Sequence, residues 1–188
     1  MNYAANVTTK NMSLSVRDLS LIGVFAAIIA ILSQIGIPMP YGVPMTLQTF
    51  AIPFAGLVLG AKRGTLATVV YILLGAVGAP VFSGFSGGIG IVLGMTGGFI
   101  LSFPLLSFWA GFGGSKNNVF WLVLCLVCGA VMNYLCGVLW FSFVMSSSLE
   151  TAFAACVLPF IPTDCIKIVL VTLSGRLVKD ALTKARVL

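Results

Sequence analysis

The sequence contains no histidine and very few charged residues. Only 7% of its 188 residues are charged, ten basic and four acidic, whereas soluble domains carry roughly a quarter charged residues. Histidine is the commonest general base and metal ligand, so its absence argues against the familiar hydrolytic enzymes and against a metal site. Because 60% of the residues are hydrophobic, a soluble core of this size cannot bury them all. The composition therefore indicates an integral membrane protein.

The chain also lacks a nucleotide-binding loop. Its glycine-rich segment, residues 83–98, has no Gly-Lys-Ser/Thr ending to reach the phosphates of a nucleotide, and no other segment supplies one. We therefore expect no ATP hydrolysis by this chain. Gly90, Gly94 and Gly98 recur every four residues, a spacing that favours close helix packing. No segment offers a nucleophile with a base or a set of metal ligands, so we predict neither enzymatic activity nor a cofactor.

Three long stretches of the chain, residues 19–61, 64–115 and 117–149, carry no charge. Each exceeds the roughly 20 apolar residues that one bilayer crossing needs, and two have room for a helix, a turn and a second helix. Pro and Gly mark several of the turns. The pattern predicts an all-α protein, a bundle of six transmembrane helices. The predicted spans are residues 19–35, 47–61, 65–79, 88–112, 119–143 and 163–177.

The positions of Lys and Arg give an independent check on this number of helices. These residues accumulate in short cytoplasmic segments. If the N-terminus is cytoplasmic, the inner segments and their flanks hold nine of the ten basic residues, namely Lys10, Arg17, Lys62, Arg63, Lys116, Arg176, Lys179, Lys184 and Arg186. The sequence thus predicts one six-helix membrane domain over residues 1–188, with cytoplasmic N- and C-terminal tails at 1–18 and 179–188. The net charge of +6 is then an orientation signal, and we expect no nucleic-acid partner.

Two ionisable residues, Asp164 and Lys167, fall within the apolar region. They follow Pro162, and the order Pro162-Thr163-Asp164 predicts a helix start with Thr163 or Asp164 as the N-cap. Their i, i+3 spacing places both side chains on one helix face, about 5–6 Å apart at Cβ. In one interpretation Asp164 complements the helix dipole and Lys167 neutralises it. We favour the other, a ligand site, because ionisable groups are costly in membranes and this pair offers an acceptor and a strong donor.

Further candidate contacts come from the fifth predicted helix. Asn133, Gly137 and Trp140 share one stripe at i, i+4 and i+7. An amide, a gap and an aromatic wall would suit a small, partly apolar molecule. Asn133 has an alternative interpretation as an interhelical hydrogen bond, and Trp140 as an interfacial anchor.

The outer loops supply the remaining candidates. Residues 33–48 contain three prolines and no charge. This segment is too stiff and too apolar to be an ordinary solvent-exposed loop. We interpret this segment as a lid over an outward-facing pocket. The candidate contacts from this loop and the next outer loop are Tyr41, Thr46, Gln48, Phe82, Phe85 and Gly88.

Three segments resemble a known family. They are PYGVPMTLQTF (40–50), YILLGAVGAPVFSGFSGGIGIVLGMTGG (71–98) and PTDCIKIVL (162–170). They look like the biotin-specific substrate-binding (S) components of energy-coupling-factor (ECF) transporters, the BioY family. The resemblance covers most of residues 20–178. Its most specific parts are the Gly-Ala-Pro-Val-Phe block and the Asp-x-x-Lys of the last helix.

The resemblance implies a multi-pass protein of the cell membrane that binds biotin on the outer side. Uptake would then depend on partners, a transmembrane coupling subunit and two ATPase subunits, which agrees with the missing nucleotide loop. The resemblance also implies that Asp164 and Lys167 belong to the biotin site. Asp164 would accept from a ureido N–H, and Lys167 would donate to the ureido carbonyl or to the carboxylate.

The first predicted helix carries four small residues at small-x-x-x-small spacing, Gly23, Ala26, Ala27 and Ala30. Such a stripe allows another helix to approach closely. Spacing alone favours packing within the same chain. The resemblance favours the alternative, a surface that docks on the coupling subunit.

The rival function is that of a self-contained secondary transporter or channel for small solutes. Ion coupling needs several titratable or ion-binding groups along a path through the membrane. The sequence has only one charged pair within its apolar region, near one predicted surface. This distribution favours the S component.

The predicted topology can be tested by labelling from one side of the membrane. Residues 40–46, 83–87 and 146–150 should face outward, while residues 62–63, residue 116 and both tails should face the cytoplasm. Single cysteines at Ser148 and Ser115, in a background without the native cysteines, should react with an impermeant maleimide from opposite sides. Labelling of both from the same side would contradict the six-helix arrangement.

Overall fold

The computed structural model describes residues 14–39 and 42–188. These residues form mainly α-helices, α1 Val16–Ser33, α2 Gln48–Leu59, α3 Ala61–Ala76, α4 Ile89–Val92, α5 Gly97–Gly113, α6 Val119–Val144, α7 Leu149–Cys156 and α8 Ile161–Lys184. A short antiparallel ribbon joins β1 Gly36–Ile37 to β2 Met45–Thr46, with Gly36 opposite Thr46. The 3-10 turn η1 Ser83–Phe85 precedes α4.

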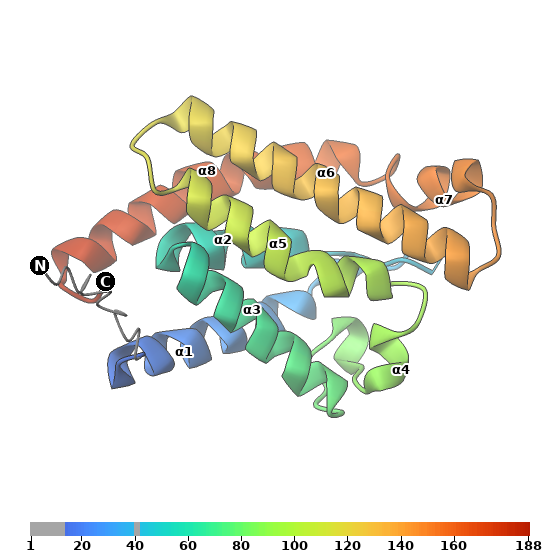
Figure 1. The fold of residues 1–188 in the computed structure, drawn as a ribbon, viewed down its shortest axis with the longest axis horizontal. Helices are drawn as coiled ribbons and strands as arrows, with labels where there is room; N and C mark the ends of the chain where they lie inside the picture. Colours follow the sequence, from blue (N-terminus) through green and yellow to red (C-terminus); the bar gives the residue numbers. More distant parts are fainter. Residues whose placement is uncertain (1–13, 40–41) are drawn as a thin grey trace, which may run out of the picture.

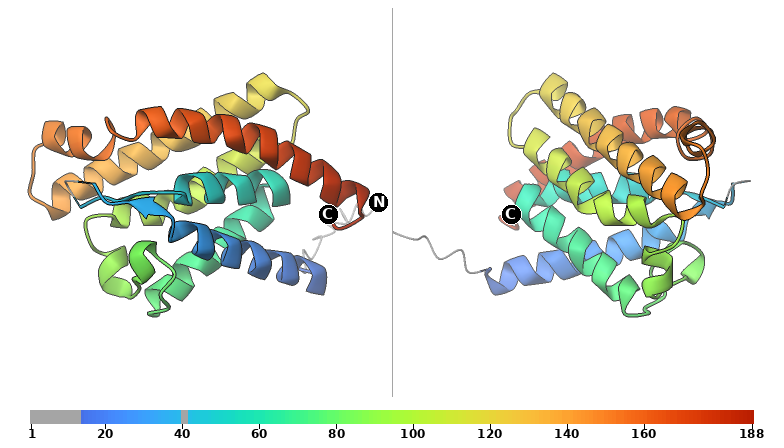
Figure 2. Two further views of the ribbon diagram at one scale, coloured as in Figure 1. Left: turned by 180° about the vertical axis from the view of Figure 1, so that it is seen from behind. Right: turned by 45° about the vertical axis from the view of Figure 1, so that its right-hand side comes forward.

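The long helices lie alongside one another, so the connections gather at two opposite ends of the bundle (Figure 1). The start of α1, the α2–α3 turn, the α5–α6 loop and the end of α8 lie at one end. The ribbon, α4 and α7 lie at the other, as the reverse view also shows (Figure 2). Helix α5 packs against α2, α3 and α6, and α2 packs against α8. The connections of the bundle are therefore divided between two opposite ends, and each end carries different elements.

Apolar side chains cover much of the outer surface of the described helices. By length and composition, α1 and α6 can each cross a membrane, and α7 with α8, bent by 49°, forms a third candidate span. Helices α2 and α5 are apolar but shorter. Large hydrophobic side chains such as Ile31, Leu139 and Leu173 are exposed to the surroundings, which suits lipid rather than water. The predicted class, a helical membrane protein, is confirmed.

Several predicted boundaries were wrong. The span expected at 88–112 is broken, because α4 ends at Val92 and α5 begins at Gly97. Residues 149–156 form the unexpected helix α7, which Ser148 caps by accepting from the Thr151 N–H. Helix α8 begins at Ile161 with Phe160 as its N-cap, so Asp164 lies in its first turn instead of capping it. The same helix continues to Lys184, so most of the expected C-terminal tail is helical.

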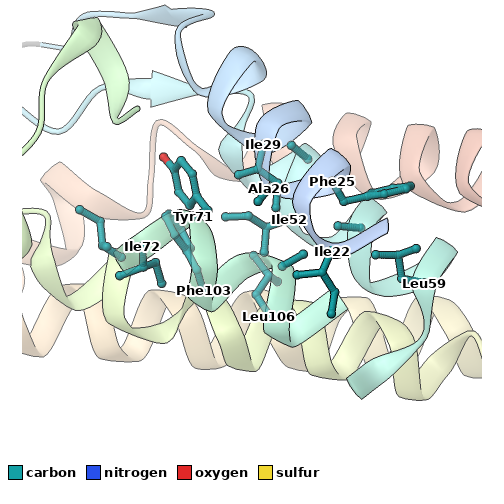
Figure 3. Packing of buried hydrophobic residues seen from close by; sticks show 14 of the residues in the cluster. Ile22, Phe25, Ala26, Ile29, Ile52, Leu59, Tyr71, Ile72, Phe103 and Leu106 are labelled. Atoms are coloured by element: carbon teal, nitrogen blue, oxygen red, sulfur yellow. The ribbon is translucent and has the colours of Figure 1, made fainter. Parts of the chain in front are cut away.

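The core beside the cavity is built by α1, α2, α3 and α5 (Figure 3). Its members include Ile22, Phe25, Ala26, Ile29, Ile52, Leu59, Tyr71, Ile72, Phe103 and Leu106. Ala26 is only 2% exposed, so it packs inside the chain. Gly23 and Ala27 lie on the exposed face of α1, and Ala30 is half-buried. The four small residues therefore do not share one surface.

Candidate functional site

A cavity of about 340 Å³ lies at the end of the bundle that carries the ribbon, α4 and α7. Small-molecule sites typically enclose roughly 300–1,000 Å³, so this cavity suits a small ligand. Its polar lining consists mainly of Thr46, Gln48, Thr49, Asn133, Tyr134 and Asp164. Its apolar lining includes Val43, Phe82, Met95, Phe99, Phe103 and Phe160. The cavity therefore combines one polar cluster with aromatic and aliphatic walls.

Asp164 is the acidic member of the polar cluster and is 8% exposed. Its Oδ1 accepts from Lys167 Nζ at 2.9 Å and from Thr49 Oγ1 at 3.0 Å. Its Oδ2 accepts from the Tyr134 hydroxyl at 2.6 Å. A carboxylate has about four acceptor positions, and these bonds use three. One position on Oδ2 is left for a ligand.

Lys167 lies behind Asp164 and does not line the cavity. Besides its ion pair with Asp164, Lys167 Nζ donates to the Thr46 carbonyl at 2.9 Å and to Thr49 Oγ1 at 2.7 Å. An ammonium group has three protons, so these bonds use all of them. In this arrangement Lys167 neutralises Asp164 and joins α8 to β2 and to the first turn of α2.

Asn133 brings a donor from α6 to the same cluster. Its Oδ1 accepts from Ser102 Oγ at 2.6 Å. Within the described residues nothing accepts a hydrogen bond from its Nδ2, and Asn133 lines the cavity. The amide N–H groups can therefore donate to a ligand beside the Asp164 acceptor.

Gln48 lines the cavity, and each of its two polar atoms makes one hydrogen bond within the protein. Its Nε2 donates to the Tyr71 hydroxyl at 2.6 Å, and its Oε1 accepts from Thr46 Oγ1 at 2.9 Å. These bonds join the first turn of α2 to α3 and to the ribbon. Gln48 thus shapes the wall as part of a hydrogen-bonded network.

Phe82 forms an apolar wall because α3 leaves room for its ring. A Cβ atom at Gly75 would lie 2.1 Å from that ring, so only glycine permits this contact. The ring also packs edge-on against Tyr71, with centroids 5.5 Å apart. The Phe82 N–H donates to the Ser86 carbonyl at 3.0 Å, which closes the loop and brings Ser83 and Ser86 to the cavity.

The structure does not bring every predicted residue to the cavity. Phe85 is 74% exposed, because the turn that points Phe82 inward directs it outward. Gly88 does not line the cavity, and its N–H donates to the Gly75 carbonyl. Trp140 does not line it either and contacts the segment between α4 and α5. Gly137 gives space to the Phe99 ring, since a Cβ there would lie 2.1 Å from it. Tyr41 lies outside the described residues.

Sequence reasoning missed two polar residues, Thr49 and Tyr134. Each directly follows a residue that was predicted, Gln48 and Asn133 respectively. On a helix, successive residues point about 100° apart. A prediction based on residues that share one helix face therefore left out both Thr49 and Tyr134. The sequence did contain a signal for both residues: each is polar, lies within an apolar helix and is adjacent to a predicted contact.

An apolar helical bundle with a closed polar cluster at one end of a small cavity defines a membrane protein that binds a small, partly apolar solute. The chain belongs to the BioY family, whose model matches residues 6–184. The resemblance inferred from the three sequence segments is thereby confirmed.

Two curated relatives and one solved structure agree with this assignment. The probable biotin transporter BioY of Pyrococcus horikoshii is 42% identical over 151 residues, which cover 80% of this chain and 89% of the relative. The biotin transporter BioY of Thermotoga maritima is 38% identical over 158 residues, covering 84% and 92%. The crystal structure of the S-component for biotin from an ECF-type ABC transporter superposes with a TM-score of 0.81 at 31% identity, covering 88% and 92%. The family consists of transporter components, so the chain is not an enzyme.

The ion pair makes a prediction about stability. Lys167→Met should destabilise the protein by roughly 3 kcal/mol, because a buried carboxylate is left without its cation. Adding Asp164→Asn to Lys167→Met should recover much of this loss, since an amide needs no counter-charge. Thermal unfolding of the purified parent, both single variants and the double variant measures the coupling. Strictly additive losses would show that the pair does not interact energetically.

Proposed function

We propose that this protein is the substrate-binding component of an ECF-type transporter and that it captures biotin from outside the cell. The observation that carries the proposal is the pairing of two open hydrogen-bonding positions at one end of an apolar cavity. One is the remaining acceptor position on Asp164 Oδ2, and the other is the Asn133 amide donor. The relatives' names, and the solved structure with 31% identity, support biotin as the ligand.

The chemistry of biotin suits this arrangement. Biotin has a ureido ring with two N–H donors and a carbonyl, an apolar thiophane ring, and a carboxylate on an alkyl tail. Asp164 accepts from a ureido N–H, and Asn133 donates to the ureido carbonyl. The apolar parts of biotin pack against the rings of Phe82, Phe99 and Phe160. Lys167 supports Asp164 by pairing with its Oδ1 and so holding the carboxylate in place.

The same proposal includes the orientation of the chain in the cell membrane. Helices α1, α2, α3, α5, α6 and α8 would be the six spans, with both ends of the chain in the cytoplasm. All the basic residues of the described chain except Lys167 support this, because they lie at or near the α2–α3 turn, the α5–α6 loop, the start of α1 and the C-terminal half of α8 (Figure 1). Basic residues favour the cytoplasmic side, so the cavity at the opposite end faces outward.

Energy for uptake would come from partner subunits, a transmembrane coupling subunit and two ATPases. The lack of a nucleotide loop in this chain supports their participation. For docking we propose the exposed face of α1, where Gly23 and Ala27 allow close approach of another helix. Ala26 belongs to the core and does not contribute to this face.

Biotin titration of the purified protein tests the ligand. Asp164→Asn should raise the dissociation constant at least tenfold, because it removes a charged acceptor from a buried contact. Asp180→Asn is the matched control, since Asp180 lies on the same helix but is exposed and distant in sequence from the cavity residues. It should bind like the parent.

Folding is checked by size-exclusion profile and unfolding temperature of each variant. Asn133→Leu, which leaves the ion pair intact, should weaken binding in the same direction. Parent-like titration by both Asp164→Asn and Asn133→Leu would refute the assigned site. Failure of the parent to bind biotin would refute the ligand.

The docking proposal is tested by placing a bulky residue on α1. Ala27→Trp should abolish copurification with the coupling subunit and ATP-dependent uptake, while biotin binding stays unchanged. Ala154→Trp on α7 serves as the control, because Ala154 is also exposed but lies at the other end of the bundle. Normal uptake by Ala27→Trp would exclude this face, and uptake by the chain without partners would favour the self-contained transporter.

A further inference from the structure

Trp140 contacts the wall of the cavity on the side that faces away from the cavity. It lies half-buried on α6, and its indole Nε1–H donates to the Gly94 carbonyl at 2.9 Å. Gly94 belongs to the segment that connects α4 to α5, and Gly94, Met95 and Thr96 all line the cavity. Trp140 itself does not line it. The indole therefore holds a segment that a bound ligand would touch, without touching the ligand.

The packing around the indole fixes this segment closely. The Gly94 carbonyl accepts a second hydrogen bond from the Gly97 N–H at 2.9 Å, so both of its lone pairs are used. A Cβ atom at Gly97 would lie 2.8 Å from Trp140 Nε1, and one at Gly98 would lie 2.4 Å from the Trp140 Cβ. Because both positions are glycine, the first turn of α5 lies directly against Trp140.

The other side of the 94–96 segment meets the loop that precedes α2. A Cβ at Gly42 would lie 3.0 Å from the Met95 sulfur. Met95 also packs against a buried cluster that includes Val43 and Phe160. Gly42, Val43 and Met95 all line the cavity. A shift of the 94–96 segment would therefore loosen its contact with the 42–46 loop and change the shape of the cavity.

We propose that Trp140 is a positioning residue for ligand retention. Its hydrogen bond holds the 94–96 segment against the 42–46 loop, so that the occupied cavity releases its ligand slowly. This inference rests on the proposed binding of biotin, and it assigns a part of the site to a residue outside the cavity. The mechanism requires the indole N–H in addition to the aromatic volume.

The test is Trp140→Phe, which keeps an aromatic ring and removes the N–H donor. Loss of one such hydrogen bond should raise the dissociation rate and the dissociation constant of biotin about fivefold. The unfolding temperature of the ligand-free protein should stay close to that of the parent. Trp121→Phe is the matched control on the same helix, because the buried Trp121 Nε1 has no hydrogen-bond partner within the described residues. It should release biotin like the parent.

A second readout follows the segment itself. With Met95→Cys in a background without the native cysteines, maleimide labelling of the ligand-free protein should be faster when Trp140→Phe is added. A purely structural role for the indole would not change this local rate selectively.

Each outcome decides the matter. Faster release and faster labelling with Trp140→Phe but not with Trp121→Phe support the inference. A parent that binds biotin, together with unchanged release by Trp140→Phe, overturns it and leaves the proposed function standing. Equal effects of the two substitutions on release, with a similar fall in unfolding temperature, also overturn it. A parent that fails to bind biotin refutes the proposed function instead.

Discussion

The buried ion pair between Asp164 and Lys167 is the interaction on which the cavity depends. Inside an apolar bundle neither charge is stable alone, and even a paired charge needs further hydrogen bonds. Thr49, Tyr134 and the carbonyl of Thr46 supply these from α2, α6 and β2. The hydrogen bonds that the ion pair requires therefore bring four parts of the chain together. These are the start of α8, the first turn of α2, the middle of α6 and the ribbon. The cavity is the space that these elements and the loops beside them enclose.

The loops that complete the cavity follow a second constraint. Non-helical backbone within a membrane must have its polar groups satisfied and must be buried in protein or line a cavity. Polar side chains at helix ends do this here. Gln34, just after α1, accepts from the Phe85 N–H at 2.8 Å and donates to the Val81 carbonyl at 3.1 Å. Trp140 donates to the Gly94 carbonyl in the same way. Each irregular wall is thus attached to a long helix.

The two ends of the bundle differ in chemistry, and α1 connects them. At the end opposite the cavity, the ion pair of Arg63 with Asp18 at 2.7 Å ties the α2–α3 turn to the start of α1. At the cavity end, Ser33 donates to the Val81 carbonyl and so holds the loop that carries Phe82. The inner face of α1 is core, while its outer face is exposed. No residue of α1 lines the cavity, so a partner docked on its exposed face, as we propose, would not touch the residues that line the cavity.

Composition and short-range spacing determined the membrane class, the basic end of the bundle, and the shared helix face of Asp164 and Lys167. These properties are local, because each depends on residues within one segment. Tertiary structure alone decided that Phe82 points inward and Phe85 outward, that residues 93–96 break a predicted helix, and that Trp140 lies behind the wall. It also decided that Thr49 meets Asp164, 115 residues away. Helical periodicity specifies which side chains share a face, but which face meets a cavity depends on how distant segments pack against it.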